Sequence, residues 1–182
     1  VPSSAGLIRD VLGKSEAWVI DQMRASVGHA KDRNLYVVAD YQDAFAADEG
    51  FLIELSAAMC DAGADRIRLC DTVGRATPDQ VTARFGRLMD AVGTDLELHA
   101  HNDLGLAVAN ALAAVDLVQS RDEHRAFYIA CTVNGLGERS GNTALEVIAM
   151  ALAKTRGLQV IELTRLADLC QMVAEMTGRP VP

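Results

Sequence analysis

Short apolar runs alternate with longer stretches of helical spacing along most of this 182-residue chain. Each short run is almost continuously apolar, which is typical of strands covered on both faces of a parallel sheet. The strands predicted in this way are Leu35–Ala39, Ile67–Cys70, Leu96–His99 and Phe127–Thr132, and Val1–Ser4 resembles the end of another. The predicted helices cover residues 16–34, Asp48–Met59, 78–92, Leu106–Val118, Thr143–Lys154 and Leu163–Met176.

Local signals at two helix starts support this division. Thr77 precedes Pro78, and Gln80 can reach back to the first residue, which together predict a capping box. The Gly-Lys-Ser sequence that ends at Ser15 resembles a phosphate-binding loop, but that motif requires glycine where this chain has Ile8. Ser15 is therefore interpreted as a helix N-cap.

The predicted strands repeat with a regular period. Their ends fall near Asp40, Cys70, His99 and Cys131, about 30 residues apart, and each step contains one helix. Strand–helix alternation of this kind predicts an α/β fold with a parallel sheet. Polar residues gather where the strands end, which is the edge at which barrels and open α/β sheets carry their chemistry.

Two histidines, His99 and His101, stand at the end of the third strand. Side chains alternate along a strand, so both point to one face, about 6–7 Å apart along the backbone. Two imidazoles so placed can bind one divalent metal, although the motif alone leaves open two polar residues at a solvated strand end. His29 and His124, late in a helix and in the charged loop 119–125, are expected at the surface.

The composition of the chain limits the kinds of binding partner and the cellular compartment that we expect. The net charge is −8 and the basic residues form no stripe, which argues against nucleic acid. The longest apolar run, Leu104–Val118, is broken by polar residues and glycine and predicts no membrane span. The four cysteines form no CxxC pair, so we expect reduced thiols and a cytoplasmic protein.

Motifs of one known family occur in three segments at the carboxyl ends of predicted strands, which we call strand exits. They are His99–Ala107, Gly135–Asn142 and Asp71–Gly74. With them the chain resembles the metal-dependent TIM-barrel acyltransferases of the DRE-TIM group, which comprise isopropylmalate, homocitrate and citramalate synthases and the related HMG-CoA lyases. The resemblance covers residues 1–182 as one catalytic-barrel segment and implies the back half of a (β/α) barrel, from strand 4 or 5 to strand 8 and the final helices.

The resemblance implies roles for individual residues. His99, His101 and Asn142 match metal ligands, and the metal is divalent zinc, magnesium or manganese. Thr72 and Ser4 match residues of the 2-oxo acid site. Glu138 and Arg139 match residues close to the catalytic step, and Asp71, Asn102 and Asp103 match residues that orient the histidines and the glycine-rich loop. For these last five, helix caps and loop ion pairs are the alternative.

The implied reaction is a Claisen condensation of acetyl-CoA with a 2-oxo acid, catalysed by a homodimer. The motifs Thr132–Arg139 and Asp71–Gly74 look closest to homocitrate synthases, which act on 2-oxoglutarate. Isopropylmalate and citramalate synthases share nearly all of these residues, and an HMG-CoA-type lyase is a further alternative. The alternative from another class of function is a half-barrel without catalytic activity.

The chain also departs from the family pattern. The first strand of the family supplies an aspartate ligand and an arginine, and this chain has no Asp-Gly-x-Gln stretch. Residues Tyr41–Asp43 replace the usual Glu-Asp pair of strand 5, and Ala5 and Leu7 replace an Asp and a His. Two histidines and an asparagine form an incomplete site, and half a barrel leaves two open sheet edges. We therefore expect the chain to be part of a longer one, or to pair with another copy.

Overall fold

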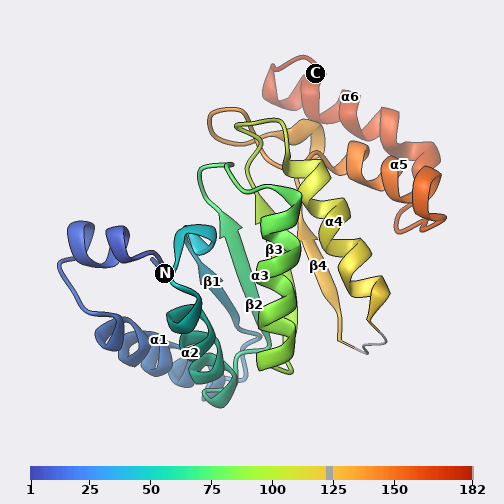
Figure 1. The fold of residues 1–182 in the computed structure, drawn as a ribbon. Helices are drawn as coiled ribbons and strands as arrows, with labels where there is room; N and C mark the ends of the chain where they lie inside the picture. Colours follow the sequence, from blue (N-terminus) through green and yellow to red (C-terminus); the bar gives the residue numbers. More distant parts are fainter. Residues whose placement is uncertain (122–124, 182) are drawn as a thin grey trace.

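The computed structural model describes residues 1–121 and 125–181, which form a parallel sheet with helices along one side (Figure 1). Its strands lie in chain order, with every neighbouring pair parallel. They are β1 (Val38–Tyr41), β2 (Arg66–Asp71), β3 (Asp95–Ala100) and β4 (Phe127–Ala130). The predicted α/β fold with a parallel sheet is confirmed.

The helices connect successive strands and extend past the last one. They are α1 (Glu16–Lys31), α2 (Glu49–Asp61), α3 (Pro78–Ala91), α4 (Ala107–Ser120), α5 (Leu145–Arg156) and α6 (Leu166–Thr177). Parallel crossovers are right-handed, and the strand order never reverses, so α2, α3 and α4 cover the same face of the sheet. Four consecutive strand–helix units of this kind, from β1–α2 to β4–α5, form a segment of a barrel.

The two faces of the sheet differ in chemistry. Tyr41, Ile67 and Leu98 have no exposed surface and belong to one apolar core beneath the helices. The residues between them on the strands face the other way, and there Glu97 forms ion pairs of 2.9 Å with both Arg66 and Arg68. The sheet therefore buries an apolar face and presents a polar, charged face on the side without helices.

Several boundaries differ from the sequence prediction. The first strand begins at Val38 rather than Leu35, because the ladder starts where Val38 pairs with Arg66, and Leu35 and Tyr36 stay exposed. The last strand ends at Ala130, before Thr132. Residues 5–11, which lie between the predicted strand end and the first predicted helix, form helical turns that include a π-helix at Leu7–Val11.

Other local predictions are confirmed. Thr77 and Gln80 form the capping box, and Ser15 accepts a hydrogen bond from the Trp18 amide at the start of α1. His29 is exposed, whereas His124 lies outside the described residues. Within the described part of the chain, no helix is long and apolar enough to span a bilayer.

Candidate metal centre

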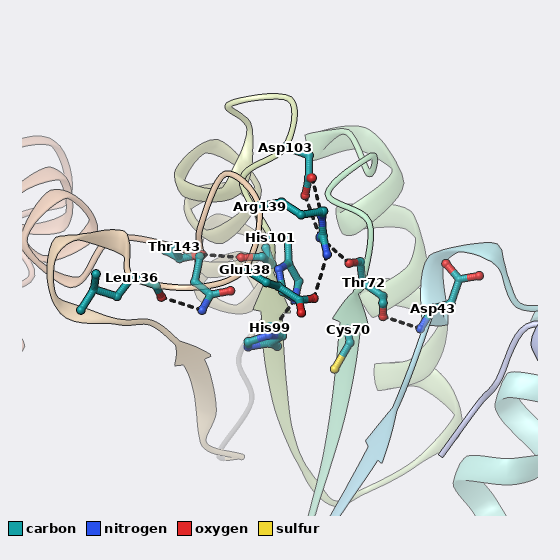
Figure 2. Close-up of polar contacts among 12 residues, drawn as sticks. Asp43, Cys70, Thr72, His99, His101, Asp103, Leu136, Glu138, Arg139 and Thr143 are labelled. Atoms are coloured by element: carbon teal, nitrogen blue, oxygen red, sulfur yellow. Dashed lines mark hydrogen bonds and ion pairs between the residues drawn. The ribbon is translucent and has the colours of Figure 1, made fainter. Parts of the chain in front are cut away.

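The two histidines meet at the carboxyl end of β3, as the alternation of side chains predicts (Figure 2). Their Nε2 atoms lie 3.2 Å apart, and the rings are nearly perpendicular at 85°. His101 is buried, at 8% exposure. Burial lowers the pKa of His99, and the neighbouring His101 lowers it further, so this imidazole is neutral at pH 7. Neutral imidazole is the form that binds a metal.

This geometry fits a divalent metal. Two nitrogens that each lie about 2.1 Å from one metal, at an angle of about 100°, are about 3.2 Å apart, which is the separation observed. Without a cation, one Nε2 must carry a proton and the other must not for the pair to attract rather than repel. The Nδ1 atom of His101 is buried and has no hydrogen-bond partner among the described residues.

Asn142 lies directly beside this pair. It forms an antiparallel bridge with His101, and the Asn102 amide donates to the Gly141 carbonyl at 2.9 Å. Residues opposite each other in such a bridge project to the same side. The Asn142 amide nitrogen donates to the Leu136 carbonyl at 2.9 Å, whereas its oxygen is buried without a partner in the described part of the chain. The amide oxygen is therefore available as a ligand.

The donor set is small. The described residues contain no group of three or more His, Cys, Asp and Glu side chains able to hold a metal. The two histidines and the Asn142 oxygen are three donors, the number of protein ligands in a catalytic zinc site. Oxygen-preferring metals need additional ligands.

The side chains of two residues predicted to orient the histidines and the glycine-rich loop accept hydrogen bonds from the backbone. Asp71 accepts hydrogen bonds from the Arg75 and Ala76 amides, both at 3.0 Å, and so holds the turn after β2. Burial raises the pKa of Asp71, and these two hydrogen bonds oppose the rise. Asn102 accepts from the Ala107 amide at 3.2 Å, at the start of α4. Both side chains shape the strand exits that surround the histidines.

Arg139 joins three strand exits above the pair (Figure 2). It donates to both carboxylate oxygens of Asp103, at 2.7 and 3.0 Å, and to the Thr72 carbonyl at 2.8 Å. It also pairs with Glu138 at 2.7 Å. The Arg139 guanidinium lowers the pKa of Asp103. Arg139 thus links the loops after β2, β3 and β4 and has no contact with the histidines among the interactions described.

Of the remaining predicted residues, Glu138 lies close to the two histidines, whereas Thr72 and Ser4 have their contacts elsewhere. A carboxylate oxygen of Glu138 lies 4.0 Å from Nε2 of His101. The Thr72 hydroxyl accepts a hydrogen bond from the Asp43 amide at 2.7 Å, which ties the exit of β2 to that of β1. Ser4 is buried beside the end of β1, where Pro2 bridges to Gln42, so β2 separates it from the histidine strand.

Sequence reasoning missed the polar cluster beneath His99. Cys70 is the register partner of His99, and its thiol donates to the Asp40 carboxylate at 2.8 Å. Asp40 also pairs with Arg68 at 3.0 Å. Burial raises the pKa of Cys70 strongly. The signal was available, because Arg66 and Arg68 alternate with Ile67 and Leu69, a strand with one charged face.

A parallel barrel segment with a two-histidine site at the carboxyl ends of its strands is the class that fold and site define. The HMGL-like family model matches residues 1–173, and the chain belongs to this family. The resemblance found in the motifs is thereby confirmed.

Known proteins agree on the fold. The chain is 41% identical over 176 residues to 2-isopropylmalate synthase 2 of Caldanaerobacter subterraneus, covering 96% of this chain and 44% of that one. It is 37% identical over 183 residues to the homocitrate synthase of Frankia alni, covering 100% of this chain and 50% of that one. The HMG-CoA lyase of Bacillus subtilis superposes with a TM-score of 0.83 at 24% identity, over 100% of this chain and 63% of that one.

These coverages define the extent of the match. The chain spans about half the length of the curated relatives it matches. The lyase structure confirms the predicted fold class, a partial TIM barrel with a sheet of four parallel strands in the described residues.

Proposed function

We propose that the protein catalyses condensation of acetyl-CoA with a 2-oxo acid at a divalent metal centre held by His99, His101 and Asn142. The observation that carries the proposal is the pair of Nε2 atoms 3.2 Å apart beside an unpartnered amide oxygen. Two of the relatives described above are named as synthases of isopropylmalate and homocitrate, and a third relative is named 2-phosphonomethylmalate synthase. A bound divalent metal would supply Lewis-acid polarisation of a keto group.

The chain's own residues would bind and orient the reactants. Thr72 and Ser4 are assigned to the 2-oxo acid. Glu138, with a carboxylate oxygen 4.0 Å from Nε2 of His101, is assigned to the proton transfer step. Arg139 would hold the three surrounding loops in place through Asp103 and the Thr72 carbonyl. In the reaction the methyl carbon of acetyl-CoA loses a proton and bonds to the keto carbon, and the keto oxygen takes up a proton to become a hydroxyl group. Water then hydrolyses the thioester and releases coenzyme A.

Among acceptors we favour 2-oxoglutarate, as in a homocitrate synthase, on the motifs Thr132–Arg139 and Asp71–Gly74. The relatives carry several names, including homocitrate synthase, 2-isopropylmalate synthase and a putative (R)-citramalate synthase. The lyase direction is the second candidate, because solved HMG-CoA lyases share the fold with TM-scores of 0.83 and 0.80. We propose further that residues 1–182 form one barrel segment, since one apolar core cluster extends from α1 to α5. We also propose that the protein is a homodimer.

The test is a coenzyme A release assay on the purified protein with a panel of 2-oxo acids, with and without chelator. We expect turnover with one acid, highest for 2-oxoglutarate, and loss of turnover with chelator. Cleavage of a hydroxymethylglutaryl thioester, without condensation, would establish the lyase instead. No turnover with any acid together with no chelator effect would end the enzyme proposal for this chain.

Metal analysis after dialysis distinguishes a metalloenzyme from a half-barrel without catalytic activity. We expect a bound divalent metal in the wild-type protein and none in His99→Ala. His29→Ala is the matched control, because His29 is exposed on α1, far along the chain from the site. Equal metal content in all three proteins would refute the assignment of His99.

A further inference from the structure

The loop that carries Asn142 and Arg139 follows β4 and is folded back on itself. The Asn142 amide donates to the Gly135 carbonyl at 3.0 Å, and the Gly141 amide donates to the Glu138 carbonyl at 3.0 Å. These bonds define the internal shape of the loop 134–142. The second half of the loop is attached to the carboxyl ends of β2 and β3, because Gly141 accepts from the Asn102 amide and Arg139 binds Asp103 and the Thr72 carbonyl. The first half of the loop needs a contact of its own.

Asn134, at the start of this loop, makes that contact. Its side chain is buried, at 7% exposure, and its amide nitrogen donates to the Cys170 carbonyl of α6 at 2.9 Å. Its backbone amide donates to a carboxylate oxygen of Glu146, on α5, at 3.0 Å. One residue therefore attaches the loop to both final helices.

The backbone conformation of Asn134 also favours asparagine at this position. Its φ of 58° lies in the left-handed region, which asparagine adopts more readily than most residues. Burial raises the pKa of the Cys170 thiol, and the neighbouring Glu146 carboxylate raises it further. Glu146, Cys170 and Asn134 thus form a node between the site loop and two helices, in which Asn134 and Cys170 are buried and Glu146 is half-buried.

We propose that Asn134 is a positioning residue of the metal site: it holds the first half of the loop 134–142 against α5 and α6, where Gly135 and Leu136 accept hydrogen bonds from Asn142. Together with the bridge between Asn142 and His101, this keeps the Asn142 side chain beside the histidines. The inference deepens the proposed function and depends on Asn142 being a ligand. A ligand loop that moves freely binds metal more weakly, because the ordering must then occur on binding. Residues that orient a ligand typically change metal affinity by 10–100-fold when they are removed.

The test uses Asn134→Gly, which keeps the left-handed backbone and the amide bond to Glu146 but removes the side chain. Asn34→Gly is the matched control, because Asn34 has a φ of 56° and is exposed on the opposite end of the fold from the site loop. Cobalt is the probe, because its absorption spectrum depends on the number and geometry of its ligands.

We expect Asn134→Gly to bind cobalt at least about 10-fold more weakly than wild type, with an altered spectrum. Hydrogen exchange of the amides at 135–142 in the metal-free protein should be at least about 10-fold faster. Asn34→Gly should match wild type in both measurements. Unchanged affinity, spectrum and exchange in Asn134→Gly would overturn the proposal, even if its melting temperature fell.

A second pair of variants tests the node through Glu146. Glu146→Gln keeps an acceptor oxygen for the Asn134 amide and should retain slow exchange of the loop, whereas Glu146→Ala should lose it. Equal exchange in both variants would contradict the assignment of Glu146. If wild-type protein binds no cobalt, the proposed function fails, and the exchange measurements alone then decide whether Asn134 positions the loop.

Discussion

Gly137→Ala is a direct test of the assigned ligand Asn142. A Cβ atom at position 137 would lie 2.6 Å from the amide nitrogen of Asn142 and 2.9 Å from its Cγ atom. These distances are too short for unbonded atoms, so something must move. Gly137 does not have a positive φ, and the obstructing atoms are the end of a side chain, so the amide rather than the backbone is displaced.

The displacement has two separable consequences. It breaks the hydrogen bond from the Asn142 amide to the Leu136 carbonyl, which costs about 1 kcal/mol of folding free energy. For a chain of this length we expect the melting temperature to fall by about 2–4 °C. It also moves the amide oxygen away from the histidines, and loss of one ligand's geometry should weaken cobalt binding by about 10–100-fold.

The assay is a cobalt titration followed by absorbance, with a thermal melt of each metal-free protein. Gly93→Ala is the control, because nothing lies within 4 Å of the added methyl group and its φ is not positive. We expect Gly93→Ala to bind cobalt as wild type does. Wild-type affinity and spectrum in a folded Gly137→Ala protein would show that the Asn142 amide is not a ligand, and would refute the reasoning.

Three further predictions follow from the ion pairs and buried groups. Arg139→Gln should speed hydrogen exchange at 72–74 and 138–141, because it removes the link to Asp103, whereas Arg9→Gln, at an exposed pair, should not. Lys31 holds the pKa of Asp65 below its ordinary value of 3.8, so the ionised carboxylate stabilises the fold above that pH, and this stabilisation is lost as the pH falls below it. In urea denaturation measured at a series of pH values, Asp65→Asn should therefore reduce the loss of stability at acid pH. An unchanged loss of stability at acid pH would contradict this. Burial raises the pKa of Cys70, so its thiol should react with a disulfide reagent at pH 8 only after the protein is unfolded in guanidinium. Rapid labelling of Cys70 in the native protein would be inconsistent with the structure.

The amino-acid sequence was sufficient for the local features of this protein. Alternation along a strand placed His99 and His101 on one face, and the Thr77 and Gln80 capping box was readable because its partners are three residues apart. The parallel α/β class followed from the period of the strands. Each of these features is encoded by spacings within one strand, one helix start or one strand–helix unit.

Features that join distant segments were decided by the tertiary structure. The start of β1 depends on its register with Arg66, 28 residues later, so the apolar run from Leu35 could not define it. Arg139 reaches the Thr72 carbonyl across 67 residues, and Asn134 reaches the Cys170 carbonyl across 36. Sequence motifs predicted Arg139 as a site residue, but only the folded loops show that it links Asp103 and Thr72. Hydrogen bonds between separate strand exits form once the sheet has brought those exits to one edge, and no local pattern encodes which pairs will meet there.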